Sequence, residues 1–153
     1  EMRDLETIQL ALTVAETGHL VFSTLHTNSA AQTIDRIVDV FPEGSKAQIR
    51  TQLASVLTAV ISQRLIPAKN GGRVPAVEVL VVTSAVRNII REGKTFMIDN
   101  IIQTGSDLGM VSLEMSLAKL VVGNLIDEAV AMEYALKPLE LQSNLRVKTM
   151  KNG

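Results

Sequence analysis

Apolar residues recur every three or four positions in several stretches of the chain, which is the spacing of an amphipathic helix. The longest such stripe begins at Ile49 and continues to Ile61. Two shorter stripes precede it, one after Asp4 and one after Asn28 or Ser29, and these residue types are preferred at helix N-caps. The pattern therefore predicts three helices in the first part of the chain, over residues 5–17, 29–41 and 49–61.

Between the first two of these helices, the run from Leu20 to Leu25 is apolar without a helical period. A short continuous run bounded by glycine and a polar loop is typical of a strand buried on both faces, as in a parallel sheet. Such a strand needs parallel neighbours joined by long crossovers, and the chain contains one strand of this kind. Because the chain also begins at Glu1 without an initiator methionine, we expect it to be a piece of a longer protein whose other residues complete the sheet.

A β-hairpin is predicted where two strand-like runs flank Asn70-Gly71-Gly72, a strong turn signal. The runs span residues 64–69 and 73–82, and Pro67 and Pro75 place them at a sheet edge because proline cannot donate a ladder hydrogen bond. The polar tail after Pro138 is expected to fray. From Ser84 onward the spacing is helical only, with helices predicted over residues 84–91, 95–103, 111–122 and 127–136.

Composition narrows the function classes. Of the 153 residues, 46% are hydrophobic and 20% are charged, so the chain can bury a core. A net charge of −1 gives no support to nucleic-acid binding. The absence of cysteine excludes disulfides and thiolate metal sites, and no apolar run approaches the ~20 residues of a membrane span. We predict an α/β core in residues 1–83, a helical region in 84–137 and a polar tail in 138–153.

His26 stands where the predicted buried strand ends and the next helix begins. Ligands of open α/β sheets bind at this edge, where helix N-termini favour phosphate, and Thr24 would add a short donor. The plainer alternative is a polar turn with an incidental histidine. If the run is a strand, His19 cannot share a metal ion with His26, because seven residues of extended chain at ~3.3 Å each separate the two by roughly 23 Å. His19 is therefore expected to be structural or to lie at an interface.

The acidic start of the chain has two interpretations. Residues 1–7 contain three carboxylates and one arginine ahead of a predicted helix, where the helix dipole alone favours acidic residues. The sharper interpretation places Glu1 at the end of a missing strand, beside Mg²⁺ and an attacking water.

Gly93-Lys94-Thr95 matches the end of a phosphate-binding loop, but Asn88 occupies the position of that motif's first glycine. The residues before it have helical spacing, whereas a phosphate loop requires a strand and a glycine-rich turn. We therefore exclude a phosphate loop here. Arg87, Arg91 and Lys94 are expected to form a cationic helix end, which is either a solvated face or a docking surface.

Three of these segments together resemble the type IV pilus retraction ATPases, the PilT branch of the secretion ATPase superfamily. Residues 1–7 resemble the end of that family's Walker B motif, residues 18–28 and 35–42 its His box and the following helix, and residues 85–94 its AIRNLIRE motif. The similarity covers roughly residues 1–136. The resemblance implies an α/β fold that is part of a RecA-like P-loop ATPase core with an edge hairpin, followed by a helical C-terminal region.

The resemblance also implies roles for individual residues. Glu1 would be the Walker B carboxylate, which orders Mg²⁺ through a bound water or polarises the attacking water. His26 would lie near the γ-phosphate of ATP as a polar sensor, with Thr24 beside it in the nucleotide site. Gly18 and His19 would belong to the His box, and the role of His19 is the less defined.

The implied assembly is a homo-hexamer that drives pilus retraction and twitching motility from the cytoplasmic face of the inner membrane. It would be peripheral to the membrane and would engage the inner-membrane platform protein of the pilus, with no nucleic acid involved. In this assembly, coupling to retraction, separate from hydrolysis, would require Arg87, Asn88, Arg91 and Glu92.

The chain also departs from the family pattern. It has no Walker A lysine, no Asp-box carboxylate and none of the arginine fingers that the family places upstream. We therefore predict that the 153 residues alone do not hydrolyse ATP, although the parent protein does. Two alternatives stay open. The parent could be a paralogous secretion or pilus accessory ATPase, and the isolated chain could act as a non-enzymatic helical interaction module from about residue 84.

Overall fold

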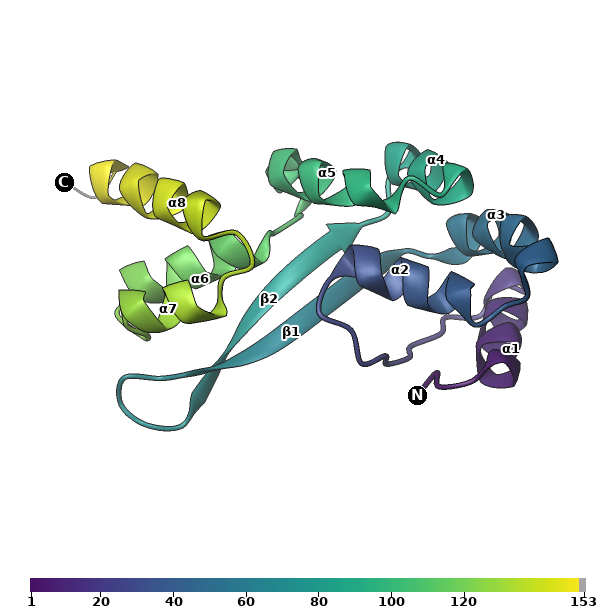
Figure 1. The fold of residues 1–153 in the computed structure, drawn as a ribbon, viewed down its shortest axis with the longest axis horizontal. Helices are drawn as coiled ribbons and strands as arrows, with labels where there is room; N and C mark the ends of the chain where they lie inside the picture. The colour runs from purple at the N-terminus through teal and green to yellow at the C-terminus, as the bar shows by residue number, and fades with distance from the viewer. Residues whose placement is uncertain (152–153) are drawn as a thin grey trace.

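The computed structural model describes residues 1–151, with side chains described for residues 1–147. A long β-hairpin runs through the middle of an elongated molecule, and helices gather around its two ends (Figure 1). The helices are α1 (Leu5–Glu16), α2 (Ala30–Asp39), α3 (Lys46–Val56), α4 (Ser84–Glu92), α5 (Ile98–Thr104), α6 (Leu113–Val122), α7 (Glu128–Tyr134) and α8 (Pro138–Lys151). The strands are β1 (Ala59–Pro67) and β2 (Arg73–Val81), and three short 3₁₀ turns are η1 (Glu43–Ser45), η2 (Thr95–Met97) and η3 (Ser106–Leu108).

The first two predicted helices are confirmed, together with their N-terminal signals. The Asp4 carboxylate accepts a hydrogen bond from the backbone N–H of Thr7 at 2.8 Å. Ser29, rather than Asn28, caps α2, because its hydroxyl accepts from the backbone N–H of Gln32 at 3.2 Å. Each cap satisfies a donor that has no partner within its own helix, which is why these residue types mark helix starts.

The hairpin is confirmed, but its first strand begins earlier than predicted. β1 and β2 pair antiparallel from Ala59 opposite Val81 to Pro67 opposite Arg73. The third helix therefore ends at Val56 and does not continue to residue 61 as we predicted. Val60 is 8% exposed whereas Ile61 is 68% exposed, so these residues alternate between two faces as a strand requires.

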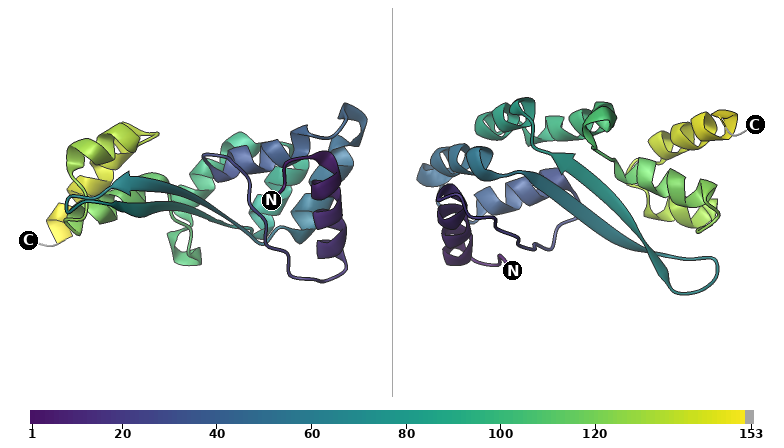
Figure 2. Two further views of the ribbon diagram at one scale, coloured as in Figure 1. Left: turned by 90° about the horizontal axis from the view of Figure 1, so that it is seen from below. Right: turned by 180° about the vertical axis from the view of Figure 1, so that it is seen from behind.

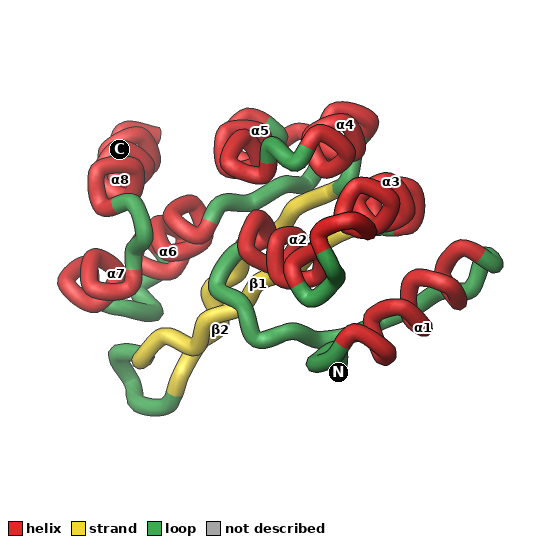
Figure 3. The backbone as a smooth tube through the Cα atoms, turned by 45° about the vertical axis from the view of Figure 1, so that its right-hand side comes forward, coloured by secondary structure: helices red, strands yellow, loops and turns green. Residues whose placement is uncertain are grey.

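The predicted buried strand over residues 20–25 is not formed. Within the described residues the sheet has two strands, and the stretch between α1 and α2 runs as a loop (Figure 3). Leu20 is 80% exposed and Phe22 is 88% exposed. This stretch is joined to the start of the chain by a backbone hydrogen bond in which Met2 N–H donates to Thr24 C=O at 3.0 Å. A strand exists only where a neighbour supplies the ladder, and in the part of the chain that the structure describes no other strand lies beside this run.

Two separate groups of buried apolar residues hold the fold together. The first, which we call the first cluster, joins α1 to α5 with the open end of the hairpin and includes Ile34, Leu53, Leu80, Ile90 and Ile98. The second cluster joins α6, α7 and α8 with the tip half of the hairpin and includes Ile66, Ala76, Leu117, Ile126 and Leu141. Figure 2 shows the corresponding groups of helices toward opposite ends of the hairpin.

Four helices after the hairpin lie close to their predicted ranges. The predicted helix over 95–103 is divided into η2 and α5. The predicted helix over 111–122 starts two residues late, because Val111 instead exchanges backbone hydrogen bonds with Val79 of β2 at 2.8 and 3.0 Å. The prediction of a frayed tail is wrong over most of its length. Residues 138–151 form α8, and Leu141 is fully buried in the second cluster, so packing orders this segment. Residues 152 and 153 of the predicted tail lie outside the described residues.

Candidate functional site

Glu1 and His26 meet on the surface near the start of the chain. Glu1 Oε1 lies 2.7 Å from His26 Nε2 and 2.5 Å from Arg3 Nε. The Glu1 side chain is 31% exposed and the His26 side chain is 84% exposed, so the cluster is open to solvent. The Met2–Thr24 backbone hydrogen bond holds the two segments side by side. The structure thus brings together Glu1, Thr24 and His26, three of the residues that the sequence singles out.

His19 lies apart from this cluster. Gly18 adopts φ +88°, a left-handed conformation that glycine tolerates, and turns the chain after α1. The hydroxyl of Thr17 lies 2.9 Å from His19 Nδ1. Gly18 and His19 line a shallow depression beside the end of α3, where Ser55 and Thr58 form the other side. The two histidines therefore bracket the loop, and one of them lies beside Glu1.

The Glu1 carboxylate is held in its charged form. The hydrogen bond from the Arg3 guanidinium is the main cause that lowers the pKa of Glu1, and the contact with His26 acts in the same direction. An ionised carboxylate with two donors on one oxygen keeps its second oxygen for a further ligand. Such a group can accept a hydrogen bond from a water molecule and polarise it.

The donor set around Glu1 fits one mode of Mg²⁺ binding. Across the residues that the structure describes, no group of three or more histidine or carboxylate side chains is arranged to hold a metal ion. Mg²⁺ usually keeps several waters and binds through one or two carboxylates together with substrate phosphates. A single carboxylate at Glu1 fits contact through a metal-bound water, and it does not fit a cage built from protein ligands alone.

The N-terminus of α2 is occupied by a carboxylate that the sequence analysis missed. Glu78, on β2, accepts a hydrogen bond from the backbone N–H of Ala30 at 2.7 Å. Ser29 occupies the N–H of Gln32, so these donors are not free for phosphate as we predicted from the helix N-terminus. Glu78 is 8% exposed, and burial is the main cause that raises its pKa. The signal in the sequence was a carboxylate at an inward position of an alternating strand, two residues from Ala76 and two from Leu80.

The four residues of the helical motif on α4 divide into one that packs and three that face solvent. Arg87 donates from Nη1 to the backbone carbonyls of Ala54 and Ser55, the latter at 2.8 Å, at the end of α3. A cation at a helix C-terminus is favoured by the helix dipole, so Arg87 joins α4 to α3. The other three side chains are exposed: Arg91 donates to Asn88, and Glu92 pairs with Lys94 at 2.8 Å.

The exclusion of a phosphate loop at residues 93–95 agrees with the structure. α4 ends at Glu92, and Gly93 is its C-cap with φ +68°. This is the usual use of a glycine after a helix. Thr95 donates a hydrogen bond from its hydroxyl to the Asp35 carboxylate on α2 at 2.8 Å, so this turn is joined to α2.

Throughout the described part of the chain, no helix combines the length and apolar character needed to cross a membrane.

Comparison with known proteins gives matches over most of the chain. The model of the family described as type II/IV secretion system protein matches residues 1–71. The type IV pilus retraction ATPase PilT of Pseudomonas aeruginosa is 57% identical over 138 residues, which cover 90% of this chain and 40% of that protein. The type IV pilus ATPase PilU of the same organism is 35% identical over 121 residues, covering 78% of this chain and 32% of that protein.

A structural match extends almost from end to end. A crystal structure of the pilus retraction motor PilT with bound ADP superposes with a TM-score of 0.83 at 47% identity, covering 94% of this chain and 40% of that one. The chain therefore spans about 40% of the length of the PilT proteins it matches. This match confirms the predicted α/β fold class of a partial ATPase domain with a helical C-terminal region, although the 20–25 run is a loop in this chain.

Proposed function

Because the chain belongs to the PilT-like type II/IV secretion ATPases, we propose that it forms part of a hexameric, ATP-hydrolysing motor that powers type IV pilus retraction and twitching motility. The observation that carries this proposal is the 57% identity to PilT over 90% of the chain. The 35% identity to PilU gives less support to a paralogous accessory ATPase.

We assign nucleotide chemistry to the cluster of Glu1, Thr24 and His26. The support is the 2.7 Å contact between Glu1 and His26, because it joins the end of the Walker B segment to the end of the His box. Glu1, charged and held by Arg3, would orient a water for attack or a water of the metal shell. Mg²⁺, when bound with ATP, would neutralise charge that develops on the phosphates. His26 would donate a hydrogen bond toward the γ-phosphate, with the Thr24 hydroxyl beside it.

The 153 residues alone are proposed to be inactive. Phosphoryl transfer depends on a phosphate loop, its lysine and its metal, all placed before the reaction begins. The Gly93-Lys94 pair that resembles such a loop directly follows α4, with Gly93 as the helix C-cap. Glu1 and His26 therefore supply only one side of a nucleotide site, and the phosphate-binding side must come from elsewhere.

The exposed residues of α4 are proposed to couple the motor to retraction. Asn88, Arg91 and Glu92 form an exposed polar face, while Arg87 holds the helix to α3. This arrangement supports a docking surface for a ring neighbour or for the inner-membrane platform protein, at the cytoplasmic face of the membrane. The helices from residue 84 onward are less well suited to act as an independent module, because α4 and α5 share the first cluster with α2 and α3.

The test compares Glu1→Gln with Glu6→Gln in a protein of full family length that carries this segment. We expect ATP turnover that falls roughly 100-fold or more in Glu1→Gln and stays close to wild type in Glu6→Gln. Glu6 is the matched control, because it is an exposed carboxylate on the first turn of α1. The 153-residue chain alone should show no turnover above background. Turnover by this chain that Glu1→Gln abolishes would contradict the proposed inactivity, and equal turnover in both full-length variants would contradict the role of Glu1.

A further inference from the structure

The buried face of the hairpin is apolar at both ends and polar in the middle. Val60 and Leu80, which pair across the strands, belong to the first cluster. Toward the tip, Ile66 and Ala76 belong to the second cluster. Between them, Ser62 lies opposite Glu78, and both are at most 9% exposed. We call Ser62 and Glu78 the polar waist.

The polar waist lies between the first cluster and the second cluster, each of which forms one packed body with its helices. An apolar pair in place of Ser62 and Glu78 would join the two bodies. Two apolar side chains would bury their area with no hydrogen-bond requirement, whereas a buried carboxylate is stable only where donors satisfy it. The donor here is the backbone N–H of Ala30, the first residue of α2. This helix follows directly after the loop that carries His26. Glu78 is thus linked through one short segment to the candidate nucleotide site.

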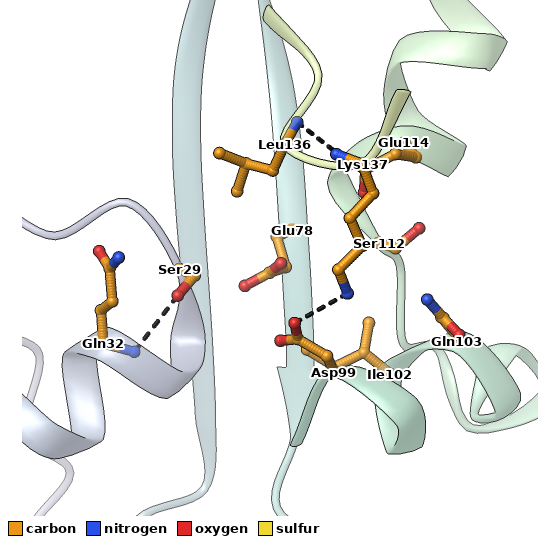
Figure 4. A pocket seen from close by; sticks show the side chains of 10 residues that line it. All are labelled: Ser29, Gln32, Glu78, Asp99, Ile102, Gln103, Ser112, Glu114, Leu136 and Lys137. Atoms are coloured by element: carbon orange, nitrogen blue, oxygen red, sulfur yellow. Dashed lines mark hydrogen bonds and ion pairs between the residues drawn. The ribbon is translucent and has the colours of Figure 1, made fainter. Parts of the chain in front are cut away.

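The other side of Glu78 faces a pocket of about 190 Å³ that lies between the two bodies (Figure 4). From the first body, Asp99 of α5 reaches into it, and from the second body Lys137 reaches back to form an ion pair at 2.8 Å. Glu114 also lines the pocket and accepts the backbone N–H groups of Leu136 and Lys137 at 3.0 and 2.9 Å. The Glu114 bonds lie within the second body, whereas the Asp99–Lys137 ion pair and the hydrogen bond from Gln103 to Glu140 cross the boundary. Water can replace such polar contacts at small cost.

We propose that Glu78 is a positioning residue that couples the C-terminal helices α6 to α8 to the loop carrying His26. In this proposal, Lys137 lines the same pocket as Glu78, moves with the C-terminal helices and carries one of the charges that act on Glu78. Glu78 in turn holds the first turn of α2 through its hydrogen bond with Ala30. The strength of this bond determines how firmly the loop before α2 is held. The proposal rests on the assignment of His26 to the nucleotide site for its functional meaning, but the coupling itself is a property of this chain.

The charges that face Glu78 support this linkage. Burial is the main cause that raises the pKa of Glu78, and neighbouring charges add to or oppose it: Asp99 and Glu114 raise this pKa, whereas Lys137 lowers it. Asp99 belongs to α5, Glu114 to α6, and Lys137 immediately precedes α8. A change in how α6 to α8 lie against α5 would alter the balance of these charges at Glu78.

The test is amide hydrogen exchange at Ala30, measured by NMR in the 153-residue chain. Glu78→Gln keeps an acceptor for this N–H but removes its charge, so we expect exchange to accelerate about tenfold. Lys137→Met removes a side chain whose ion pair is with Asp99 of α5, and it should accelerate exchange at Ala30 about threefold. The double variant should match Glu78→Gln alone. Lys137→Arg, which retains the charge, should behave as wild type. Lys69→Met is the matched control, since Lys69 pairs with Asp127 at the hairpin tip, and should leave exchange at Ala30 unchanged.

Two results would overturn the coupling. One is an exchange rate at Ala30 that Lys137→Met leaves unchanged. The other is a double variant whose acceleration equals the product of the effects of Glu78→Gln and Lys137→Met. A second measurement, ATP turnover in the protein of full family length, reports on function. Glu78→Gln is expected to lower kcat about tenfold with little change in KM, while the thermal unfolding midpoint of the 153-residue chain does not fall. A parallel loss of kcat and stability would indicate a structural role only. If the exchange rates show the coupling but the wild-type protein of full family length does not hydrolyse ATP, the proposed function is contradicted and the coupling is not. Failure of the coupling and failure of the proposed function are therefore distinguishable.

Discussion

Glu1 Oε1 and His26 Nε2 lie 2.7 Å apart, although the whole of α1 and the following loop separate the two residues along the chain. The contact depends on one backbone hydrogen bond beside it, from Met2 to Thr24. It joins a charged carboxylate and an imidazole, two kinds of group that act on protons in catalysis.

The two histidines should differ sharply in their effect on ATP turnover. In a protein of full family length, His26→Ala is expected to lower kcat roughly 10- to 100-fold, because it removes a hydrogen-bond donor from the nucleotide site. His19→Ala is the matched control, since the side chain of His19 contacts the Thr17 hydroxyl and lies away from Glu1. Both side chains are exposed, so neither change should alter the thermal unfolding midpoint much. Equal losses of kcat in the two variants would contradict the assignment of His26.

Arg87 should be needed for stability, unlike its exposed neighbours on α4. Arg87→Ala removes two hydrogen bonds to the C-terminal carbonyls of α3, and because the side chain is half-buried we expect a loss of about 1–2 kcal/mol in the free energy of unfolding. Asn88→Ala should cost less than about 0.5 kcal/mol. Urea denaturation of both variants measures the difference. An Arg87→Ala variant as stable as wild type would contradict this packing role. Any effect of the variant on retraction would then belong to coupling and not to packing.

The ionisation of Glu78 should make the chain less stable as the pH rises. Burial raises the pKa of Glu78 above its ordinary value of 4.5, so the folded chain binds this proton more tightly than the unfolded chain. Its contribution to the free energy of unfolding is therefore complete below pH 4.5 and is lost as the pH rises through the folded pKa. Glu78→Gln cannot titrate and should lack this component.

The measurement is urea denaturation of wild type and Glu78→Gln at several pH values from about 4 to 8. The stability of Glu78→Gln relative to wild type is expected to increase across this range. The carboxylates whose pKa is lowered, such as Glu1 and Asp4, contribute slopes of the opposite sign in both proteins, and these cancel in the difference. A difference that is flat or that falls with pH would show that Glu78 is not penalised by burial.

The loop before His26 should promote self-association of the isolated chain. Leu20 and Phe22 are exposed apolar side chains on a segment with few backbone partners, and such segments associate with other chains. Phe22→Ser is expected to raise the fraction of monomer in analytical ultracentrifugation at a given concentration. Thr13→Ser, on the exposed side of α1, is the control and should change nothing. A wild-type chain that sediments as a single monomeric species at high concentration would be the contrary result.

Features that depend on neighbouring residues were predictable. The caps at Asp4 and Ser29 and the glycine turn at residues 71 and 72 form through contacts within a few positions, so local patterns locate them. The identification of the Glu1 and His26 segments was also possible from short motifs. In each case the interaction involves residues a few positions apart, so the residue types in a short segment are enough to predict it.

Features that depend on distant partners were not predictable. Val60 and Ile61 continue the apolar stripe of α3, and only their alternation in the hairpin shows that they belong to a strand. Leu141 orders α8 because α6 and α7 form a surface for it. The 20–25 run stays a loop because neither strand among residues 1–151 lies beside it. The partner of Glu78, an N–H group of α2, likewise became visible only in the folded chain. Burial and ladder pairing are set by segments far apart in sequence, which is why the tertiary structure alone decided them.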